Sequence, residues 1–271
     1  MRILVENFDL KLSVLSGQPI NFIYKNLFNN KNIICIEYKI NDKNLIIEQK
    51  NKNEINIKGS YSKLREFVIS EFRLDDDLGK IISTLSKDKI LCKIIALNRG
   101  LRLTKHNPWE TAICFVSSQR SSIKKTRKTI QNLIQLFNGF PTPNQILKAG
   151  NKKLNACGFG YRTDYIIETA KYFSNRKIEE IEKLTESELK SELMGIHGIG
   201  PKVSDCILLY GFGFVDIFPI DIWIKRVMEK LYFNNNKKSL EEIQAFAKKR
   251  WGNLSGYAQL YLYKYALDYL K

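Results

Sequence analysis

The chain has 271 residues, of which 44% are hydrophobic and 27% charged, as in an ordinary globular protein with one large domain or two to three small ones. Its longest apolar runs are far shorter than the ~20 residues of a membrane-spanning helix, and its N-terminus is too polar for a signal peptide. The five cysteines stand singly, which argues against a disulfide framework, a zinc ribbon or a four-cysteine iron–sulfur cluster. We therefore expect a reduced, intracellular protein.

The charge is strongly positive and unevenly distributed. The 44 Lys and Arg residues exceed the 28 Asp and Glu residues, which gives a net charge of +16. Residues 87–162 hold 15 basic side chains against two acidic ones, whereas residues 163–271 are nearly balanced. A run of charge is often only a solvated face, but so local an excess favours a surface that binds a polyanion. Nucleic acid is favoured over a membrane, because the sequence lacks a basic amphipathic helix with bulky exposed aromatic residues.

The spacing of apolar residues changes once along the chain. Residues 1–58 contain short apolar bursts with a period near two, separated by turn-forming residues, which predicts a small antiparallel sheet. From about Tyr61 the spacing is that of helices. We expect an α+β fold, with a small N-terminal antiparallel sheet domain in residues 1–75 followed by an all-α body in residues 76–271 that consists of two helical subdomains with a cleft between them.

Several helix starts and faces can be read in the second part. Pro108 suits the first position of a helix, and Thr142-Pro143-Asn144-Gln145 has the form of a capping box. Apolar faces at helical spacing are predicted for Ile166, Ile167, Ala170 and Phe173, and for Val203, Cys206, Ile207 and Tyr210.

A glycine-rich turn occupies residues 195–200, Gly-Ile-His-Gly-Ile-Gly, and Pro201 begins a new helix after it. Gly198 and Gly200 lack a Cβ, so the chain can turn tightly and direct backbone N–H groups outward at a helix N-terminus, which is a site for a phosphate. A helix–helix turn without a ligand is the alternative. The net charge favours the phosphate site.

Lys202 and Asp221 are the candidate chemical groups. Lys202 lies in the first turn of the new helix, where the positive end of the helix dipole disfavours an ammonium, as a nucleophilic amine requires. A simple phosphate contact by Lys202 is equally compatible with this segment. Asp221 follows 19 residues later, just before another helix. It could be only an N-cap, but a carboxylate held there could also stabilise a developing cation or move a proton.

These residues resemble the helix-hairpin-helix (HhH-GPD) glycosylases of base excision repair. The turn, Lys202 and then Pro219-Ile220-Asp221 match the pattern of the bifunctional members, and the N-terminal sheet domain is similar to that of 8-oxoguanine DNA glycosylase/AP lyases. Further similar segments are Ser16-Gly17-Gln18, Phe72–Asp75, Asn107–Ser118, Gly158–Arg162, Lys202–Cys206, Trp251-Gly252 and Gly256–Gln259.

The resemblance implies an enzyme that turns a damaged guanine out of duplex DNA. Lys202 would attack C1′, expel the base and form a Schiff base, after which β-elimination would cleave the strand. Asp221 would stabilise the oxocarbenium-like sugar. Cys206 and Tyr263 would contact the two faces of the base, Gln259 its Watson–Crick edge, and the carbonyl of Gly17 its N7–H. Individually, these four residues could equally be ordinary core, helix or turn residues.

The resemblance also implies a DNA-binding surface, with two departures from the family pattern. Trp223 stands where many relatives have histidine, and Gln119-Arg120 replaces part of an asparagine-rich segment that fills the vacated base stack. Gln119 or Arg120 would fill that gap, and selectivity for cytosine opposite the lesion is left open. The expected DNA-binding residues are Gln119, Arg120, Lys124, Lys128, Arg162, Gly198, Gly200 and Trp223.

We expect no cofactor and no catalytic metal, although the resemblance allows a structural monovalent cation at the hairpin. The expected partner is duplex DNA containing 8-oxoguanine, met in the cytoplasm or nucleoid, and nothing in the sequence requires more than a monomer. Two alternatives are a related glycosylase for another base, such as an alkylated adenine, and a non-catalytic DNA-binding hairpin module. The first usually lacks a lysine at the Lys202 position. In the second, Lys202 and Asp221 would be incidental.

Overall fold

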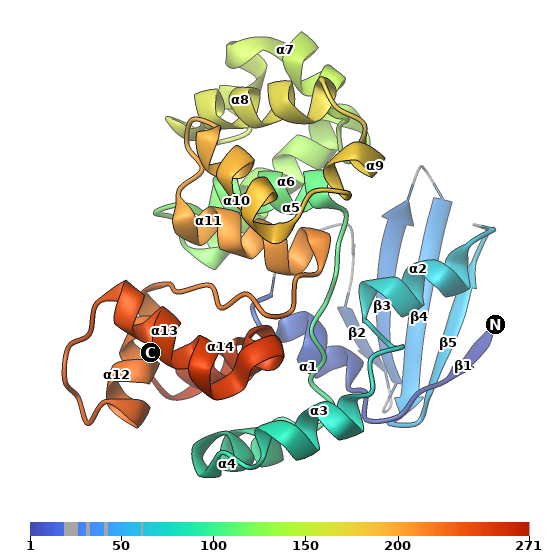
Figure 1. Cartoon of the computed structure of the whole chain (residues 1–271). Coiled ribbons are helices and arrows are strands. Elements are labelled where there is room, and N and C mark those ends of the chain that lie inside the picture. The colour runs from blue at the N-terminus through green and yellow to red at the C-terminus, as the bar shows by residue number, and fades with distance from the viewer. Residues whose placement is uncertain (19–26, 31–32, 41–42, 61, 271) are drawn as a thin grey trace.

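The computed structural model describes residues 1–18, 27–30, 33–40, 43–60 and 62–270. In this part of the chain a small sheet comes first and helices make up the rest, which confirms the predicted α+β fold (Figure 1). None of the described helices is long and apolar enough to cross a membrane.

The sheet is antiparallel, and its strands in the described residues follow the order β1-β5-β4-β3-β2. Their bounds are β1 Arg2–Leu4, β2 Leu27–Asn30, β3 Ile33–Ile40, β4 Lys43–Asn51 and β5 Glu54–Gly59. Ile36 pairs with Ile47, and Ile47 pairs with Ile57 on its other side. All three are buried, so the period of two seen in the sequence places one face of the sheet in a core. Helix α2 (Leu64–Glu71) covers this core.

A short helix, α1 (Leu10–Leu15), lies within the region that was predicted to be only sheet. Asp9 caps it by accepting a hydrogen bond from the backbone N–H of Leu12 at 2.8 Å. Leu10, Ser13 and Val14 are its buried residues, at the spacing of a helical face. Asp9 as an N-cap, followed by this spacing, is the sequence signal for α1.

The helical body contains α3 Leu78–Leu85, α4 Lys89–Leu97, α5 Pro108–Ser118, α6 Ile123–Phe137, α7 Pro143–Ala156, α8 Arg162–Ser174, α9 Ile178–Ile181, α10 Glu186–Gly195, α11 Pro201–Ile207, α12 Ile222–Tyr232, α13 Leu240–Trp251 and α14 Ser255–Tyr269. A π-helical turn, Leu208–Phe212, continues α11. Figure 1 shows α5–α11 grouped together, with α12–α14 as a second group nearer to α4. The buried apolar residues of both groups form one continuous core, separate from that of the sheet. The division of the chain at residues 75 and 76 stays a prediction.

The predicted helix starts are present. Pro108 is the first residue of α5, and Thr142 and Gln145 form the capping box of α7. The apolar residues predicted to share a face are buried on α8 and α11, except that Ile167 is only partly buried. No pattern in the sequence predicts the π-helical turn.

Candidate active site

The glycine-rich turn joins α10 to α11 and brings Lys202 to a helix N-terminus. Gly198 has φ +95°, and a Cβ there would lie 2.2 Å from the ring of Tyr165, so the turn requires glycine at this position. Gly200 is exposed, and a Cβ there would meet nothing within 4 Å. The backbone at the start of α11 is therefore open on this side, and phosphate binding there stays a prediction.

Lys202 lies in the first turn of α11 and is partly buried. Its ammonium Nζ lies 4.9 Å from the centre of the Phe115 ring on α5, within the range of a cation–π contact. The amine is therefore held against an aromatic surface, partly shielded from solvent.

Asp221 is the N-cap of α12, as predicted. Its Oδ1 accepts hydrogen bonds from the backbone N–H groups of Trp223 at 2.9 Å and Ile224 at 2.8 Å. These contacts fix the carboxylate at the positive end of the helix. Its charge also helps to raise the pKa values of Cys206 and Tyr263, which shows that these residues lie within its electrostatic reach.

Cys206 is buried one turn after Lys202. Burial is the main cause that raises the pKa of its thiol to about 11, while the neighbouring Lys202 opposes this shift. At neutral pH the side chain is an uncharged thiol, which is a polarisable, nearly apolar surface rather than a nucleophile.

Gln259 and Tyr263 lie one turn apart on α14. The amide Nε2 of Gln259 donates to the carbonyl of Pro219 at 3.2 Å, and its Oε1 accepts from the hydroxyl of Tyr210 at 3.5 Å. Burial, followed by the electrostatic effects of Asp221 and of Cys206, raises the pKa of Tyr263 above its usual value. Its hydroxyl therefore keeps its proton.

The turn after α1 reaches this group of residues. Gly17 has φ +84°, and a Cβ there would lie 2.9 Å from Cε1 of Tyr263 and 2.7 Å from Cδ1 of Leu267. The next residue, Gln18, is buried and fastens the turn to the helical body, because its Nε2 donates to the carbonyl of Arg102 at 2.9 Å and its Oε1 accepts from the N–H of Thr104 at 2.8 Å. The structure therefore brings Gly17 to the predicted base pocket.

The predicted DNA-contacting residues fall into two groups. In the first, Gln119 donates from Nε2 to the carbonyl of Gly198 at 2.8 Å, and so links the end of α5 to the glycine-rich turn. Arg162 is 5% exposed and donates to the carbonyls of Gln119 at 2.7 Å and Arg120 at 3.2 Å. As placed, Arg162 supports the loop from within, and its contact with DNA stays a prediction.

The second group is exposed. Arg120 points to solvent in a left-handed backbone conformation with φ +47°, and Lys124 and Lys128 are exposed one turn apart on α6. Trp223 is partly exposed, and the guanidinium of Arg226 lies 5.1 Å from its ring centre. Because cations attract phosphates over several ångströms, exposed basic side chains need no fixed position for that attraction.

Two residues at the site were not among the predicted site residues, Phe115 and Tyr210. Their rings stack with centroids 5.7 Å apart and planes 28° apart, between Lys202 on one side and Gln259 on the other. Phe115 lies on α5, and Tyr210 lies in the π-helical turn that continues α11, where the sequence predicts only an apolar face. Their role depends on contacts between segments far apart in the chain.

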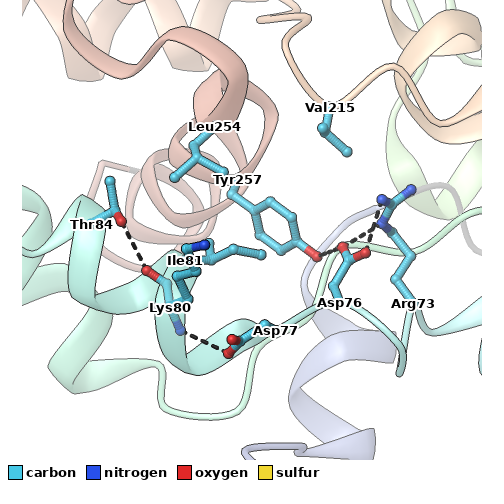
Figure 2. Close-up of a pocket in the computed structure, with 9 residues that line it drawn as sticks. All are labelled: Arg73, Asp76, Asp77, Lys80, Ile81, Thr84, Val215, Leu254 and Tyr257. Atoms are coloured by element: carbon cyan, nitrogen blue, oxygen red, sulfur yellow. Dashed lines mark hydrogen bonds and ion pairs between the residues drawn. The ribbon is translucent and has the colours of Figure 1, made fainter.

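A pocket of about 250 Å³ lies elsewhere and shares none of these residues (Figure 2). Its lining comes from α3, from the segment just before α3 and from the residues around the start of α14, together with Val215. Asp76 closes one side of it, because it pairs with Arg73 and accepts a hydrogen bond from the Tyr257 hydroxyl. Among the residues that the structure describes, no three His, Cys, Asp or Glu side chains lie close enough together to hold a metal ion. The expectations about cofactors stay predictions.

Two family models match the chain. Residues 113–253 match the HhH-GPD superfamily of base excision DNA repair proteins, and residues 1–112 match the N-terminal domain of 8-oxoguanine DNA glycosylase. The two matches together cover both the sheet and most of the helical body.

Individual proteins match over most of the chain as well. A probable N-glycosylase/DNA lyase of Methanothermobacter thermautotrophicus is 27% identical over 98% of this chain and 96% of its own length. An N-glycosylase/DNA lyase of Saccharomyces cerevisiae is 28% identical over 74% of this chain and 66% of its own length. The crystal structure of Clostridium acetobutylicum 8-oxoguanine glycosylase/lyase, in complex with double-stranded DNA containing cytosine opposite 8-oxoguanine, is 28% identical and has a TM-score of 0.86 over 98% of this chain and 94% of that chain.

Proposed function

The chain belongs to the HhH-GPD superfamily of base excision DNA repair proteins, and we infer that it is a bifunctional glycosylase and AP lyase that excises 8-oxoguanine from duplex DNA. One observation carries the chemistry of this proposal. Lys202 at the start of α11 and Asp221 at the start of α12 are both within electrostatic reach of the buried thiol of Cys206. An amine and a carboxylate therefore stand beside one partly buried site.

Lys202 is the proposed nucleophile. In its unprotonated form the amine adds to C1′ of the damaged nucleotide while the N-glycosidic bond breaks and the base leaves with the bonding electrons. The nitrogen then loses a proton, and its lone pair forms the C1′=N bond of the Schiff base as the C1′–O4′ bond breaks and O4′ takes up a proton. Removal of a C2′ proton expels the 3′-phosphate, which completes β-elimination and cleaves the strand.

Asp221 supplies negative charge where positive charge develops. As the base departs, the sugar becomes oxocarbenium-like, and a fixed carboxylate stabilises that cation more than it stabilises the neutral nucleotide. The two backbone N–H groups that bind Oδ1 hold the carboxylate in place, so little rearrangement is needed during the reaction.

The base would lie between Cys206 and Tyr263, with Gln259 at its Watson–Crick edge. We propose that the carbonyl of Gly17 accepts the N7–H that 8-oxoguanine has and guanine lacks. The close approach of Gly17 to Tyr263 supports this arrangement, because it brings the turn after α1 to the proposed stacking residue. A single reversed hydrogen bond in a dry site is worth a few kcal/mol, so about 2 kcal/mol of discrimination is expected from this contact.

We propose that the exposed lysines of α6, together with Arg120, Trp223 and the backbone of Gly198 and Gly200, hold the DNA backbone. Gln119 or Arg120 would fill the gap that the extruded base leaves. The amine and carboxylate supply the chemistry, so the reaction needs no cofactor, and any monovalent cation at the hairpin would be structural. We further propose that the protein acts as a monomer on chromosomal DNA in the cytoplasm or nucleoid.

The test is a trapping experiment. The protein is mixed with a duplex containing one 8-oxoguanine, in the presence of a chelator, and borohydride is added to reduce the Schiff base. We expect a covalent protein–DNA adduct with wild type and a loss of excision of at least about 1,000-fold with Lys202→Gln. Lys249→Gln, which changes an exposed lysine of α13, is the matched control and should behave as wild type.

Three results would contradict the proposal: no adduct with wild type, an undiminished adduct with Lys202→Gln, or a strict need for the chelated metal. A duplex containing an alkylated adenine serves as the competing substrate. Preferential excision of that base would instead support a glycosylase for alkylated bases, and binding without excision of any base would support a non-catalytic hairpin module.

A further inference from the structure

Tyr210 lies next to Gln259 at the proposed base pocket, and it has no role in the mechanism proposed above. It is 4% exposed and belongs to the π-helical turn Leu208–Phe212. Its carbonyl accepts a hydrogen bond from the N–H of His106 at 2.7 Å, and its ring stacks on Phe115. Both the backbone and the ring of Tyr210 are therefore held, which leaves its hydroxyl in one place. π-Helical turns within helices are often found at functional sites.

The hydrogen-bond partners of Gln259 determine the orientation of its amide, that is, which sides its Oε1 and Nε2 face. The carbonyl of Pro219 can only accept a hydrogen bond, so the group that faces it at 3.2 Å must be Nε2. The oxygen Oε1 then faces the hydroxyl of Tyr210, which must donate. Burial, with smaller effects from Cys206, Tyr263 and Asp221, raises the pKa of Tyr210, so this hydroxyl keeps the proton that it donates.

We propose that Tyr210 is a specificity-determining residue, which fixes the amide of Gln259 in the orientation that matches a guanine-type edge. After its contacts with Pro219 and Tyr210, the amide has one N–H and one acceptor position left. A guanine-type edge presents the O6 acceptor beside the N1–H donor, and both find complementary groups. An adenine-type edge presents a donor and an acceptor in the reverse order and meets two mismatches.

This inference rests on the proposed function, since it assumes that Gln259 reads the base. It adds a second level of selection to that of Gly17. The carbonyl of Gly17 would distinguish an oxidised purine from a normal one, because N7–H is present only in the oxidised form. Tyr210, acting through Gln259, would distinguish oxidised guanine from oxidised adenine.

The experiment compares single-turnover excision of 8-oxoguanine and of 8-oxoadenine, which shares the N7–H but has the reversed Watson–Crick edge. Tyr210→Phe removes only the hydroxyl and keeps the ring on Phe115. We expect 8-oxoguanine excision to fall about 10-fold and the preference for 8-oxoguanine over 8-oxoadenine to fall by a similar factor. Tyr261→Phe is the matched control, because it removes another buried hydroxyl of a tyrosine that donates to a backbone carbonyl, that of Leu101 at 3.1 Å. It should leave the preference unchanged.

Two further measurements separate positioning from general damage. In a Gln259→Ala background, Tyr210→Phe should have no additional effect on the preference, because Tyr210 acts through the missing amide. On a duplex with an abasic site, which has no base to read, Tyr210→Phe should form the borohydride adduct as wild type does. If the Phe variant is too unstable to assay, Tyr210→Met also lacks the hydroxyl and should show the same lost preference.

An unchanged preference in Tyr210→Phe, or equal losses with and without Gln259, would overturn the role of Tyr210. So would a weakened adduct on the abasic duplex, since that step does not involve the base. Failure of the proposed function is a different result: wild type itself would then form no adduct on either duplex.

Discussion

The basic segment of residues 87–162 and the nearly neutral segment of residues 163–271 hold their functional side chains in different ways. Lys124 and Lys128 are exposed to solvent on α6. Lys202, Asp221 and Gln259 are buried or partly buried and are held by an aromatic ring, two backbone N–H groups and a backbone carbonyl, respectively.

The difference follows from the distance over which each group acts. Attraction between a lysine and a phosphate extends over about 10 Å at 0.1 M salt, so a mobile side chain is sufficient. Bond formation at C1′ and reading of a base edge require groups that are fixed to a fraction of an ångström. One segment is therefore suited to affinity and the other to chemistry, and substitutions in each should have different signatures.

After the loss of the nucleophile in Lys202→Gln, the largest effect should come from removing the negative charge of Asp221 at the rigid site. Asp221→Asn keeps a good N-cap, because asparagine also accepts from backbone N–H groups, but it removes the negative charge. We expect the single-turnover rate of excision to fall about 100-fold while affinity for DNA changes little. The measurement is excision at saturating enzyme together with a binding titration.

Asp77→Asn is the control for this substitution. Asp77 also caps a helix, accepting from the N–H of Lys80 at 2.9 Å, but that helix is α3, which contributes no residue to the proposed pocket. Its excision rate should equal that of wild type. Equal rates for Asp221→Asn and wild type would mean that Asp221 serves only the helix.

A smaller and different effect is expected in the basic segment. Lys124→Ala and Lys128→Ala should each weaken binding by about 3- to 10-fold and reduce the slope of affinity against salt by up to about 1 per lost phosphate contact. Damaged and undamaged duplexes should be affected equally, and the excision rate at saturation should not change. Lys249→Ala, an exposed lysine from the nearly neutral segment, is the comparison. A loss confined to damaged DNA would show that these lysines read the lesion.

The smallest effect concerns Glu110, which lies in the basic segment yet is partly buried. Loss of hydration, with a smaller contribution from the carboxylate of Glu71, raises the pKa of Glu110 to about 8 from an ordinary value of 4.5. The folded state therefore holds this proton more tightly than the unfolded state does. Its contribution to stability is complete below about pH 4.5 and is lost as the pH rises to about 8.

Glu110→Gln cannot titrate and should flatten this dependence. Thermal unfolding followed from pH 5 to pH 8 should show the Tm of wild type falling by a few degrees more than that of the variant. Parallel curves for the two proteins would contradict a proton bound at Glu110.

Local features of the site could be predicted from the sequence, and contacts between distant segments could not. The N-cap role of Asp221 depends on its neighbours in the chain. In the structure its carboxylate accepts hydrogen bonds from the backbone N–H groups of Trp223 and Ile224, as an N-cap does. The burial of Arg162 and the hydrogen bond between Tyr210 and Gln259 join residues more than 40 positions apart. No spacing rule encodes such contacts. The sequence therefore predicts only an apolar helix face for Tyr210 and only a DNA-binding role for Arg162.

The attachment of Gln18 to the backbone of Arg102 and Thr104 has a consequence for how the enzyme is divided into parts. The proposed catalytic amine and carboxylate both come from the last third of the chain, whereas the carbonyl proposed to recognise N7–H comes from its first 20 residues. The proposed chemistry and the proposed lesion choice thus lie on separate pieces of polypeptide. The buried amide of Gln18 is one of the contacts that join them, together with Ser13, whose Oγ accepts from the N–H of Arg102 at 3.1 Å. Loss of the Gln18 hydrogen bonds would leave Lys202 and Asp221 in place in the helical body. The carbonyl of Gly17 would no longer be held at the proposed pocket, so the enzyme would lose selectivity against undamaged guanine.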